Sequence, residues 1–559
     1  MVAHPLGTPQ PKTPRAAVLI AAALLVFSML PLAVAWAAQG TDWHFAGSLL
    51  GAEDGNSYLG KMRLGATGAW DFSLFYTTEP HAGAPLVFLP YLAAGRLVSL
   101  VVPEISPAHT SALIIAFHLF RLAANAAYLA VLWRFVCRFV SAPGTRVTAY
   151  LLACLGGGLG FLAPVLNLGT PPEFYIPEGF SPLVMLILPH VALSRVFMLG
   201  GLLCFFAALD TPADRPVRRA LVAGFCWVVV GLCVPFYLPV LYAVLGAWGA
   251  VAWLKARRFP PDMLRLGLIA CAPSLPFFVW YFYVFSANPA FAVWSAQNLL
   301  PSPSPLTYAL AYIVLAVPAI VGAREAWRRA SEHRAWLLLI AWPVAAALLV
   351  YIPLNVQRRM SEAVIVPLAI LAAIGLLGWA GRSPLRHRAA VAWTMLGTLS
   401  SILLLVAVTG SLALPGLPLF RPAPEADMLA WLNTNSPPGT VVLASPATGN
   451  VLPAAAHLRP VMGHGPETLE WQRKTLLVRQ FFAGEMTPDE SRALLDGGGC
   501  LESAPSLCGD PVDYIIFGPL ETALRRETTA PAPDFAALGF TLRYDDAGYQ
   551  VWAANRLSP

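Results

Sequence analysis

The sequence predicts an α-helical membrane protein that crosses the bilayer about eleven times and ends in a small α/β domain. Composition is the first observation behind this fold class. Of the 559 residues, 57% are hydrophobic and only 12% are charged, whereas soluble domains carry about 25% charged residues. The second observation is that the apolar residues gather in long stretches, as membrane spans require.

The first apolar stretch, residues 16–38, contains no charge and follows Lys12 and Arg15. Ala35-Trp36-Ala37 resembles a cleavage site, but the run is longer than the apolar region of a signal peptide, so we expect an uncleaved anchor. Ten further stretches are long enough to span: 110–136, 147–166, 183–208, 220–234, 236–254, 262–285, 305–323, 335–354, 361–380 and 389–412.

The loop charges predict the orientation of these spans. Arginines gather near residues 134–146, 215–219, 324–334 and 382–388, and loops rich in Lys and Arg face the cytoplasm. Residues 1–15 then form a cytoplasmic tail, and an odd number of spans places the C-terminus outside. We therefore expect a multi-pass protein of the plasma (inner) membrane with an extracytoplasmic C-terminal domain.

The segment 85–102 does not fit this alternation as a span. It is apolar but contains Arg96, and counting it as a span would invert the charge of every later loop. We expect an interfacial helix in contact with membrane lipids. The preceding residues 39–84 then form a loop on the outer side, and the transmembrane domain extends over 16–418.

From residue 419 to residue 559 the composition is that of a soluble α/β domain. The segments 439–445 and 512–518 are typical of buried strands, and 540–554 is typical of a terminal hairpin. Cys500 and Cys508 lie in this polar region, where an oxidising compartment would let them form a disulfide. The other six cysteines read as small hydrophobic residues.

The composition and motifs also exclude some function classes. No basic run with interleaved aromatic residues indicates nucleic-acid binding. No GxGxxG or Walker motif supports nucleotide binding. The cysteines and histidines show no metal-ligand spacing.

The residues that could carry chemistry begin with an adjacent carboxylate pair, Glu53 and Asp54, in the outer loop. Other polar residues are expected on the same side or inside spans: Glu79, His81, Arg121, His190, Arg195, Gln357, Arg358 and Arg359. Charges inside a membrane are costly and usually face a cavity or a partner. Each also fits a structural role, as a solvated charge, a headgroup anchor or a buried histidine, and a structural loop is favoured for His464 and Glu467.

The order of these features resembles the GT-C glycosyltransferases, which include protein O-mannosyltransferases and lipid A aminoarabinose transferases. The shared features are a first span, an outer loop with an acidic pair followed by SYLGKMRLGATGAW, and an interfacial helix. The span HLFRLAANAAYLAVLWRF, residues 118–135, is similar to the arginine-bearing span of that family. The resemblance covers residues 16–412 and is strongest over 41–125. Gly83-Ala84-Pro85-Leu86 departs from the Lys-Pro-Pro-Leu-like element often found there.

The resemblance implies transfer of a sugar from a polyprenyl-phosphate donor to a glycan, lipid or protein acceptor, with inversion. Asp54 would be the base, with Glu53 as the alternate, and Arg358 and Arg359 would stabilise the leaving phosphate. The residues implied in substrate binding are Tyr58, Lys61, Arg63, Glu79, His81, Arg121, His190, Arg195, Gln357, Arg358 and Arg359. No cofactor is certain. A divalent cation at the acidic pair is possible, but no second ligand cluster supports it.

Three other functions remain open from the sequence. A transporter or flippase of lipid-linked sugars would explain the intramembrane arginines, although no internal repeat is evident. A non-catalytic membrane scaffold or sensor would act through the C-terminal domain. A polymerase or ligase of lipid-linked glycans would share the substrate class.

Overall fold

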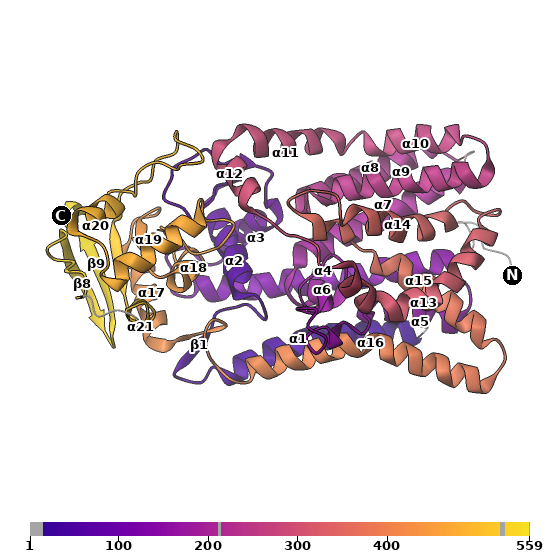
Figure 1. Ribbon diagram of the computed structural model, residues 1–559, viewed down its shortest axis with the longest axis horizontal. Helices are drawn as coiled ribbons and strands as arrows, with labels where there is room; N and C mark the ends of the chain where they lie inside the picture. Colours follow the sequence, from indigo (N-terminus) through magenta and orange to yellow (C-terminus); the bar gives the residue numbers. More distant parts are fainter. Residues whose placement is uncertain (1–14, 211–213, 526–530, 558–559) are drawn as a thin grey trace. The chain divides into compact units, whose positions relative to one another are not determined.

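The computed structural model describes residues 15–210, 214–525 and 531–557 (Figure 1). The expected N-terminal tail lies outside the described residues, apart from Arg15. The chain forms two compact units, each built from segments distant in the sequence. The helical unit comprises Met1–Pro31, Phe120–Tyr281 and Leu299–Gly410, and the sheet unit comprises Leu32–Leu119, Phe282–Asn298 and Ser411–Pro559. The sheet unit is thus larger than the C-terminal domain expected from the sequence.

Each apolar stretch expected to span the membrane contains at least one helix. The helices are α1 (Arg15–Ala38), α4 (His109–Phe139), α5 (Pro143–Leu155), α6 (Ser181–Ile187), α7 (Pro189–Asp210), α8 (Pro216–Cys233), α9 (Tyr237–Ala256), α10 (Pro261–Cys271), α11 (Leu275–Ala287), α13 (Pro305–Arg329), α14 (Trp336–Leu349), α15 (Ile365–Ala380) and α16 (Pro384–Leu412). Within the described residues, eight helices are long and apolar enough to cross a membrane, with Pro143–Leu162 (α5 and the 3₁₀ turn after it) counted as one helix. Among the same residues the number is nine if α10 and α11 form one span bent by 54°. These helices indicate a multi-pass membrane protein.

The number of full-length spans is therefore smaller than the expected eleven, for local reasons. α14 has only 14 residues. α15 has only 16 because the stretch 361–380 begins irregularly: Ala363 has a left-handed φ of 53°. The stretch 183–208 is also divided, between α6 and α7 at Pro189, which has no N–H group to continue the helical hydrogen bonds, but α7 alone is still long enough to span.

Small residues bring helices of the helical unit into close contact. A Cβ atom on Gly322 of α13 would lie 1.9 Å from the carbonyl oxygen of Leu371, and one on Gly375 of α15 would lie 1.9 Å from that of Pro318. Glycine at such crossings lets backbones approach without a side chain between them. The α13–α15 crossing therefore depends on these two glycines.

The sheet unit contains a five-stranded mixed sheet in the order β6-β5-β7-β9-β8. The strands are β5 (Val441–Leu443), β6 (Arg459–Pro460), β7 (Tyr514–Phe517), β8 (Phe540–Asp546) and β9 (Tyr549–Ala554). β5 is parallel to β6 and β7, while β9 is antiparallel to β7 and β8. The expected strands and terminal hairpin of the C-terminal domain are thus confirmed.

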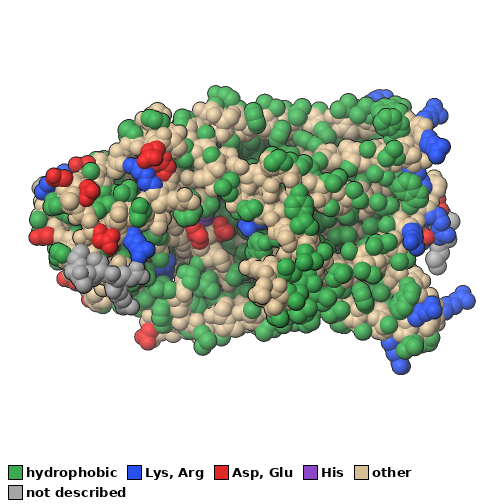
Figure 2. All heavy atoms as spheres, viewed as in Figure 1, with side chains coloured by type: hydrophobic (Ala, Val, Ile, Leu, Met, Phe, Trp, Pro, Cys, Tyr) green, Lys and Arg blue, Asp and Glu red, His purple; other side chains and the backbone are tan. Residues whose placement is uncertain are grey.

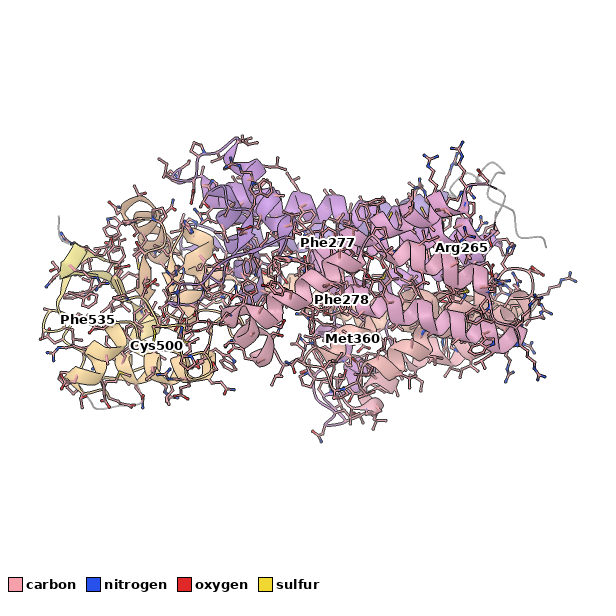
Figure 3. The ribbon with its side chains drawn as sticks, turned by 90° about the horizontal axis from the view of Figure 1, so that it is seen from above. Arg265, Phe277, Phe278, Met360, Cys500 and Phe535 are labelled. Carbon is pink, nitrogen blue, oxygen red and sulfur yellow. A yellow bond between two sulfur atoms is a disulfide. The ribbon has the colours of Figure 1, made fainter. Side chains whose placement is uncertain are left out.

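Helices cover both faces of this sheet. They are α17 (Ala423–Asn435), α18 (Pro446–Ala455), α19 (Trp471–Ala483), α20 (Pro488–Leu495) and the short α21 (Pro519–Ala523). Met428 of α17 packs with Val442 on one face, and Phe481 of α19 packs with Leu443 on the other. Phe535, labelled in Figure 3, belongs to the second core. Cys500 and Cys508 are joined in a disulfide.

The expected outer loop 39–84 contains four regular elements of secondary structure. Its elements are β1 (Trp43–Phe45), α2 (Ala52–Ala66), β2 (Asp71–Phe72) and the start of β3 (Ala84–Pro85). β1 pairs with β4 (Phe420–Pro422), and β2 pairs with β3. α12 (Pro289–Gln297) completes the helices of this unit.

The apolar segment 85–102 contains a single helix, α3 (Leu89–Ser99), of 11 residues. α3 packs closely on α2, because a Cβ atom on Gly95 would lie 1.6 Å from the carbonyl oxygen of Met62. Leu97, Leu100 and Val101 at its end are 65%, 72% and 82% exposed. The interfacial location of α3 stays a prediction.

We expect Gly95→Ala to destabilise the sheet unit by about 1–3 kcal/mol, the usual range for overpacking, because the new methyl group collides with the backbone of α2. Gly200→Ala in α7 is the matched control, since a Cβ atom there meets nothing within 4 Å. The control should be neutral or stabilising, as expected for glycine replacement in a helix. Thermal unfolding in detergent measures both. Equal midpoints for Gly95→Ala and the wild type would contradict the close α2–α3 contact.

Candidate functional site

The acidic pair lies in the first turn of α2. Gly51 precedes the helix in a left-handed conformation, with φ 62°. Glu53 and Asp54 follow, where the positive end of the helix dipole favours carboxylates. Both residues are exposed. A rigid helix end, rather than an irregular loop, therefore presents the two carboxylates.

The segment after β6 holds these carboxylates from the other side. His464 Nε2 lies 3.3 Å from Asp54 Oδ1. The backbone N–H of Gly465 donates to Glu53 Oε1 at 2.5 Å. The side chain of Asn450 donates to the carbonyl oxygen of Glu53 at 3.3 Å. The C-terminal part of the chain thus orients both acidic side chains.

A buried ion pair supports this arrangement from within. Lys61 of α2 is fully buried, and its Nζ lies 2.7 Å from Glu467 Oε1. Ser57 donates to the other oxygen of Glu467 at 2.9 Å. The Lys61 ammonium also lies 4.1 Å from the centre of the Phe88 ring, a favourable cation–π distance. The charges therefore alternate from Lys61 through Glu467 and His464 to Asp54.

This alternation determines the protonation of the cluster. Burial lowers the pKa of His464, but the carboxylates of Glu467, Asp54 and Glu53 outweigh it, so the pKa is raised above its ordinary value. Burial raises the pKa of Glu467, but Lys61 and His464 outweigh it and the pKa is lowered. The structure thus favours an ionised Glu467 and a His464 that keeps its proton to higher pH.

The remaining candidates on α2 point into the protein. Tyr58 stacks on Tyr91 with ring centres 4.8 Å apart. Arg63 is fully buried and donates to the carbonyl oxygen of Ala454 at 3.0 Å and to Thr110 at 2.7 Å. Lys61 and Arg63 therefore contact protein groups. Their roles in substrate binding stay predictions.

Glu79 and His81 are also engaged with protein groups. Glu79 forms a buried ion pair with Lys474 at 2.7 Å. His81 Nε2 accepts from the Leu74 N–H at 3.0 Å, and its Nδ1 lies 2.8 Å from the carbonyl oxygen of Glu79. This pattern suits a neutral ring with the proton on Nδ1. Burial, together with the charge of Arg459, lowers the pKa of His81.

The intramembrane candidates lie in the helical unit. Arg195 of α7 forms a fully buried ion pair with Glu362 at 2.7 Å and donates to the carbonyl oxygen of Glu178 at 2.8 Å. Arg121 of α4 donates to the carbonyl oxygen of Ser28 at 2.7 Å. His190 is buried in the first turn of α7. The sequence reasoning did not identify Glu362 as the partner of Arg195.

Gln357, Arg358 and Arg359 form one turn of 3₁₀ helix, Gln357–Ser361, which also contains the Met360 labelled in Figure 3. Gln357 accepts from the backbone of residue 302 at 3.2 Å. Arg358 lies over the Tyr175 ring at 5.3 Å, and Arg359 Nε lies 3.7 Å from Glu178 Oε1.

Two buried polar atoms at or beside this turn lack a hydrogen-bond partner within the described part of the chain. They are Arg358 Nε and Glu178 Oε2. The turn thus brings three candidate residues together next to the acidic side chain of Glu178.

The structure therefore gathers the candidates into separate clusters. The acidic cluster (Glu53, Asp54, Lys61, His464 and Glu467) lies within the sheet unit. The arginine turn (Gln357–Ser361) lies within the helical unit. In residues 15–210, 214–525 and 531–557, no three or more His, Cys, Asp or Glu side chains are grouped so that they could hold a metal ion. The acidic cluster thus does not fit a metal centre built from three such ligands.

Comparisons with solved structures identify the fold. The apo crystal structure of the Archaeoglobus fulgidus oligosaccharyltransferase matches 97% of this chain and 74% of its own, with 12% identity and a TM-score of 0.51. The chain has the GT-C fold. The resemblance expected from the sequence is thus confirmed at the level of the fold.

Two further matches have similarly low identity. The same archaeal enzyme, AglB, in complex with an inhibitory peptide and a dolichol-phosphate, matches 98% of this chain and 75% of its own, with 13% identity and a TM-score of 0.52. ArnT from Cupriavidus metallidurans bound to undecaprenyl phosphate matches 95% of this chain and 98% of its own, with 15% identity and a TM-score of 0.48. No protein-family model and no curated protein sequence matches the chain.

The pH dependence of stability tests the acidic cluster. Because the folded-state pKa of His464 is raised, its stabilising effect is fully present below about pH 6.5, its unfolded value. The effect is lost as the pH rises through the folded-state pKa. We expect His464→Gln to lose about 1–3 kcal/mol of stability at low pH and progressively less above neutrality, as measured by unfolding in detergent.

His81→Gln is the matched control for that experiment. The pKa of His81 is lowered, so its stabilising effect should shrink as the pH falls rather than as it rises. A stability difference between the wild type and His464→Gln that does not change with pH would contradict the charged His464–Asp54 pair.

Proposed function

We propose that this protein is a membrane glycosyltransferase that transfers a sugar from a polyprenyl-phosphate donor to an extracytoplasmic acceptor, with inversion. One observation carries the proposal. An Asp54 side chain that is 63% exposed stands on the first turn of a buried helix and contacts His464, in a chain with the GT-C fold. The AglB structure with dolichol-phosphate supports the donor class.

The chemistry needs one base and one stabilised leaving group. The acceptor oxygen forms a bond to the anomeric carbon as Asp54 removes its proton. The bond from that carbon to the phosphate oxygen breaks, and the phosphate leaves with the electron pair. Direct attack from the opposite face gives inversion. Because the leaving group is a phosphate, its departure requires charge stabilisation rather than protonation.

His464 and Gly465 would position the acidic pair for this step. The contact with His464 orients the Asp54 carboxylate, while most of that side chain stays accessible to an acceptor. Glu53 accepts the Gly465 N–H and so is held at the same helix end. We assign the proton transfer to Asp54 and a supporting role to Glu53.

Arg358 and Arg359 would stabilise the leaving phosphate. A guanidinium group binds phosphate oxygens through two parallel N–H donors. The buried Arg358 Nε without a partner among the described residues supports this assignment. The Glu178 carboxylate, which lies 3.7 Å from Arg359 Nε, would orient the Arg359 guanidinium.

The proposed orientation places the N-terminus in the cytoplasm and the acidic cluster outside. The arginine-rich loops of the sequence support it. The disulfide between Cys500 and Cys508 supports it as well, because disulfides persist in oxidising compartments. In this orientation the acidic cluster meets donors on the outer face of the membrane.

The Asp54→Asn variant tests the proposed function. Membranes containing the protein should transfer label from one of a panel of radiolabelled polyprenyl-phosphate sugars. Asp54→Asn keeps the shape of the side chain but removes the proton acceptor, so turnover should fall by about 10²–10⁴-fold while donor binding persists. Glu53→Gln should reduce turnover less.

Two of the alternative functions, a scaffold and a flippase, predict no transfer of label in this assay. A scaffold would transfer no label, and a flippase would move the donor without transferring its sugar. If Glu53→Gln is inactive and Asp54→Asn is active, Glu53 is the base and Asp54 supports it. The location of the active site then stays as proposed. Wild-type turnover in both variants would contradict the assignment of this site.

The arginine turn is tested by Arg358→Gln and Arg359→Gln. Loss of a charged phosphate partner should weaken use of the donor by about 1.5–3 kcal/mol per residue, measured as a loss in kcat/KM for the donor. Arg218→Gln, an exposed arginine of α8, is the matched control and should behave as the wild type. Unchanged donor kinetics in well-folded single and double variants would leave these arginines as headgroup anchors.

A further inference from the structure

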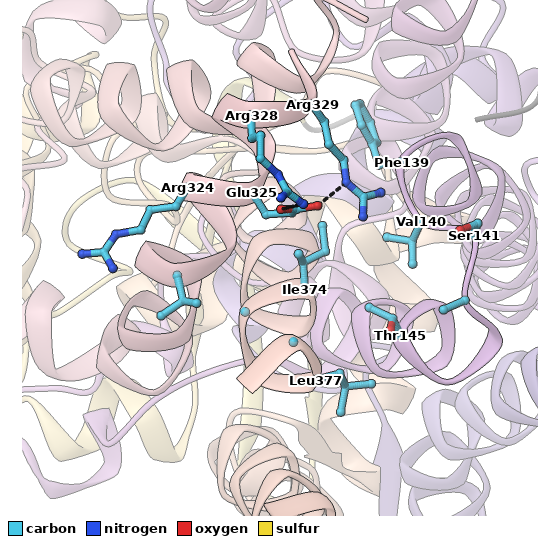
Figure 4. Close-up of a pocket in the computed structure, with 14 residues that line it drawn as sticks. Phe139, Val140, Ser141, Thr145, Arg324, Glu325, Arg328, Arg329, Ile374 and Leu377 are labelled. Atoms are coloured by element: carbon cyan, nitrogen blue, oxygen red, sulfur yellow. Dashed lines mark hydrogen bonds and ion pairs between the residues drawn. The ribbon is translucent and has the colours of Figure 1, made fainter. Parts of the chain in front are cut away.

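The helical unit contains a pocket of about 540 Å³ that is lined neither by the arginine turn nor by Arg121 or Arg195 (Figure 4). Three elements line it: the last turns of α13, the second half of α15, and the turn that joins α4 to α5. We name it the α13 pocket. All its lining residues belong to the helical unit.

The charges of the α13 pocket are unbalanced. Its lining includes Arg324, Arg328 and Arg329 but a single acid, Glu325. Arg328 lies 2.7 Å and Arg329 lies 2.5 Å from the Glu325 carboxylate, and in Figure 4 both guanidinium groups turn toward it while Arg324 extends away. Three cations against one anion leave a net charge of +2.

The donors of these arginines exceed what Glu325 can accept. Each guanidinium carries five N–H donors, whereas one carboxylate accepts about four hydrogen bonds. The Arg328 side chain is 79% exposed, and Arg329 also rests on the Trp336 ring at 5.2 Å. A second anion beside Glu325 would therefore find oriented donors.

Apart from the hydroxyl groups of Ser141 and Thr145, the rest of the α13 pocket is apolar. Val140, Val321, Ile374 and Leu377 line it, and Gly378 leaves one wall without a side chain. Val321 is 46% exposed, on a helix apolar enough to lie in a membrane. Figure 2 shows basic side chains gathered at one end of the helical unit and hydrophobic side chains along its flank. An occupant must therefore combine an anionic head with an apolar chain.

We propose that the α13 pocket binds one anionic phospholipid. Its phosphate accepts hydrogen bonds from Arg328 and Arg329 beside Glu325, and an acyl chain lies on Val321, Ile374 and Leu377. Basic pockets between transmembrane helices suit such headgroups. The lipid would brace the α13–α15 crossing, which depends on Gly322 and Gly375. The proposal does not depend on glycosyl transfer.

The first experiment tests the charges by native mass spectrometry of the detergent-purified protein with added phosphatidylglycerol or phosphatidylcholine. The wild type should retain one phosphatidylglycerol and lose phosphatidylcholine. The double variant Arg328→Gln/Arg329→Gln should bind phosphatidylglycerol at least about tenfold more weakly, as loss of charged hydrogen-bond partners predicts. Glu325→Gln should bind it more tightly, because the competing carboxylate is gone.

The matched control for charge is Arg218→Gln/Arg265→Gln. Both arginines are exposed on helices of the same unit, Arg265 is labelled in Figure 3, and neither lines the α13 pocket. This variant removes the same charge and should retain phosphatidylglycerol as the wild type does. An equal loss in this control would mean that retention follows net charge and would overturn the proposal.

The second experiment fills the pocket without changing any charge. A Cβ atom on Gly378 meets nothing within 4 Å, so Gly378→Phe should place its ring in the pocket without disturbing helix packing. Gly246→Phe in α9, equally open, is the steric control. Phosphatidylglycerol retention should be lost in Gly378→Phe and kept in Gly246→Phe.

Several results would overturn the proposal. Wild-type retention in both Gly378→Phe and Arg328→Gln/Arg329→Gln would place the lipid elsewhere. Equal retention of phosphatidylcholine would make the pocket an unselective apolar groove. Displacement of phosphatidylglycerol by excess inorganic phosphate would make it a phosphate site. A dimer that forms through the pocket and blocks phosphatidylglycerol would make the occupant a second copy of the chain.

Discussion

The arrangement of the sheet unit depends on one buried ion pair, between Lys61 and Glu467. The two residues are 406 positions apart, and their charged atoms lie 2.7 Å apart in the protein interior. Removing either partner would leave an uncompensated buried charge, which costs about 3–5 kcal/mol. The pair therefore holds α2 and the segment after β6 in one register, and that register sets where Asp54 and His464 meet.

A charged, hydrogen-bonded pair fixes this register because its bonds are directional. Apolar contacts between α2 and α18 would tolerate small sliding motions, whereas Lys61, Ser57 and Glu467 must match in position for every donor to find its acceptor. The same reasoning applies to Glu79 and Lys474, a second buried pair in the sheet unit. The two pairs tie the expected outer loop to the α/β domain at two points.

Local sequence patterns were sufficient to predict the long apolar helices, because a long apolar stretch has few alternatives in a membrane protein. The strands of the C-terminal sheet and the acidic pair were also recognisable from local residues. The breaks within spans were harder to predict, since the division at Pro189 and the left-handed Ala363 depend on packing around one residue. The helix under the acidic pair was hidden by its three glycines, Gly55, Gly60 and Gly65, which are poor helix formers.

The partners of the candidate residues were not predictable from the sequence. His464 and Glu467 lie in a glycine-flanked segment typical of a structural loop, and nothing local indicates that they meet α2. Glu362 resembles any acid near a span, and only the structure shows that it neutralises Arg195. Such pairings join residues that are distant in the sequence, and they depend on which helices pack together. The candidate residues themselves could be found because charge in an apolar chain is rare and therefore informative.

These pairings also separate the candidates by what their side chains are able to do. Lys61, Arg63 and Arg195 are fully buried, and their charges are balanced or bonded by protein groups, so their main effect is to fix helices in place. Asp54 differs, because most of its side chain is exposed while a buried imidazole contacts one of its oxygens. A base must be both oriented and reachable. Within the acidic cluster, Asp54 meets both requirements on the evidence of its contacts and exposure, whereas Glu467 is oriented but buried.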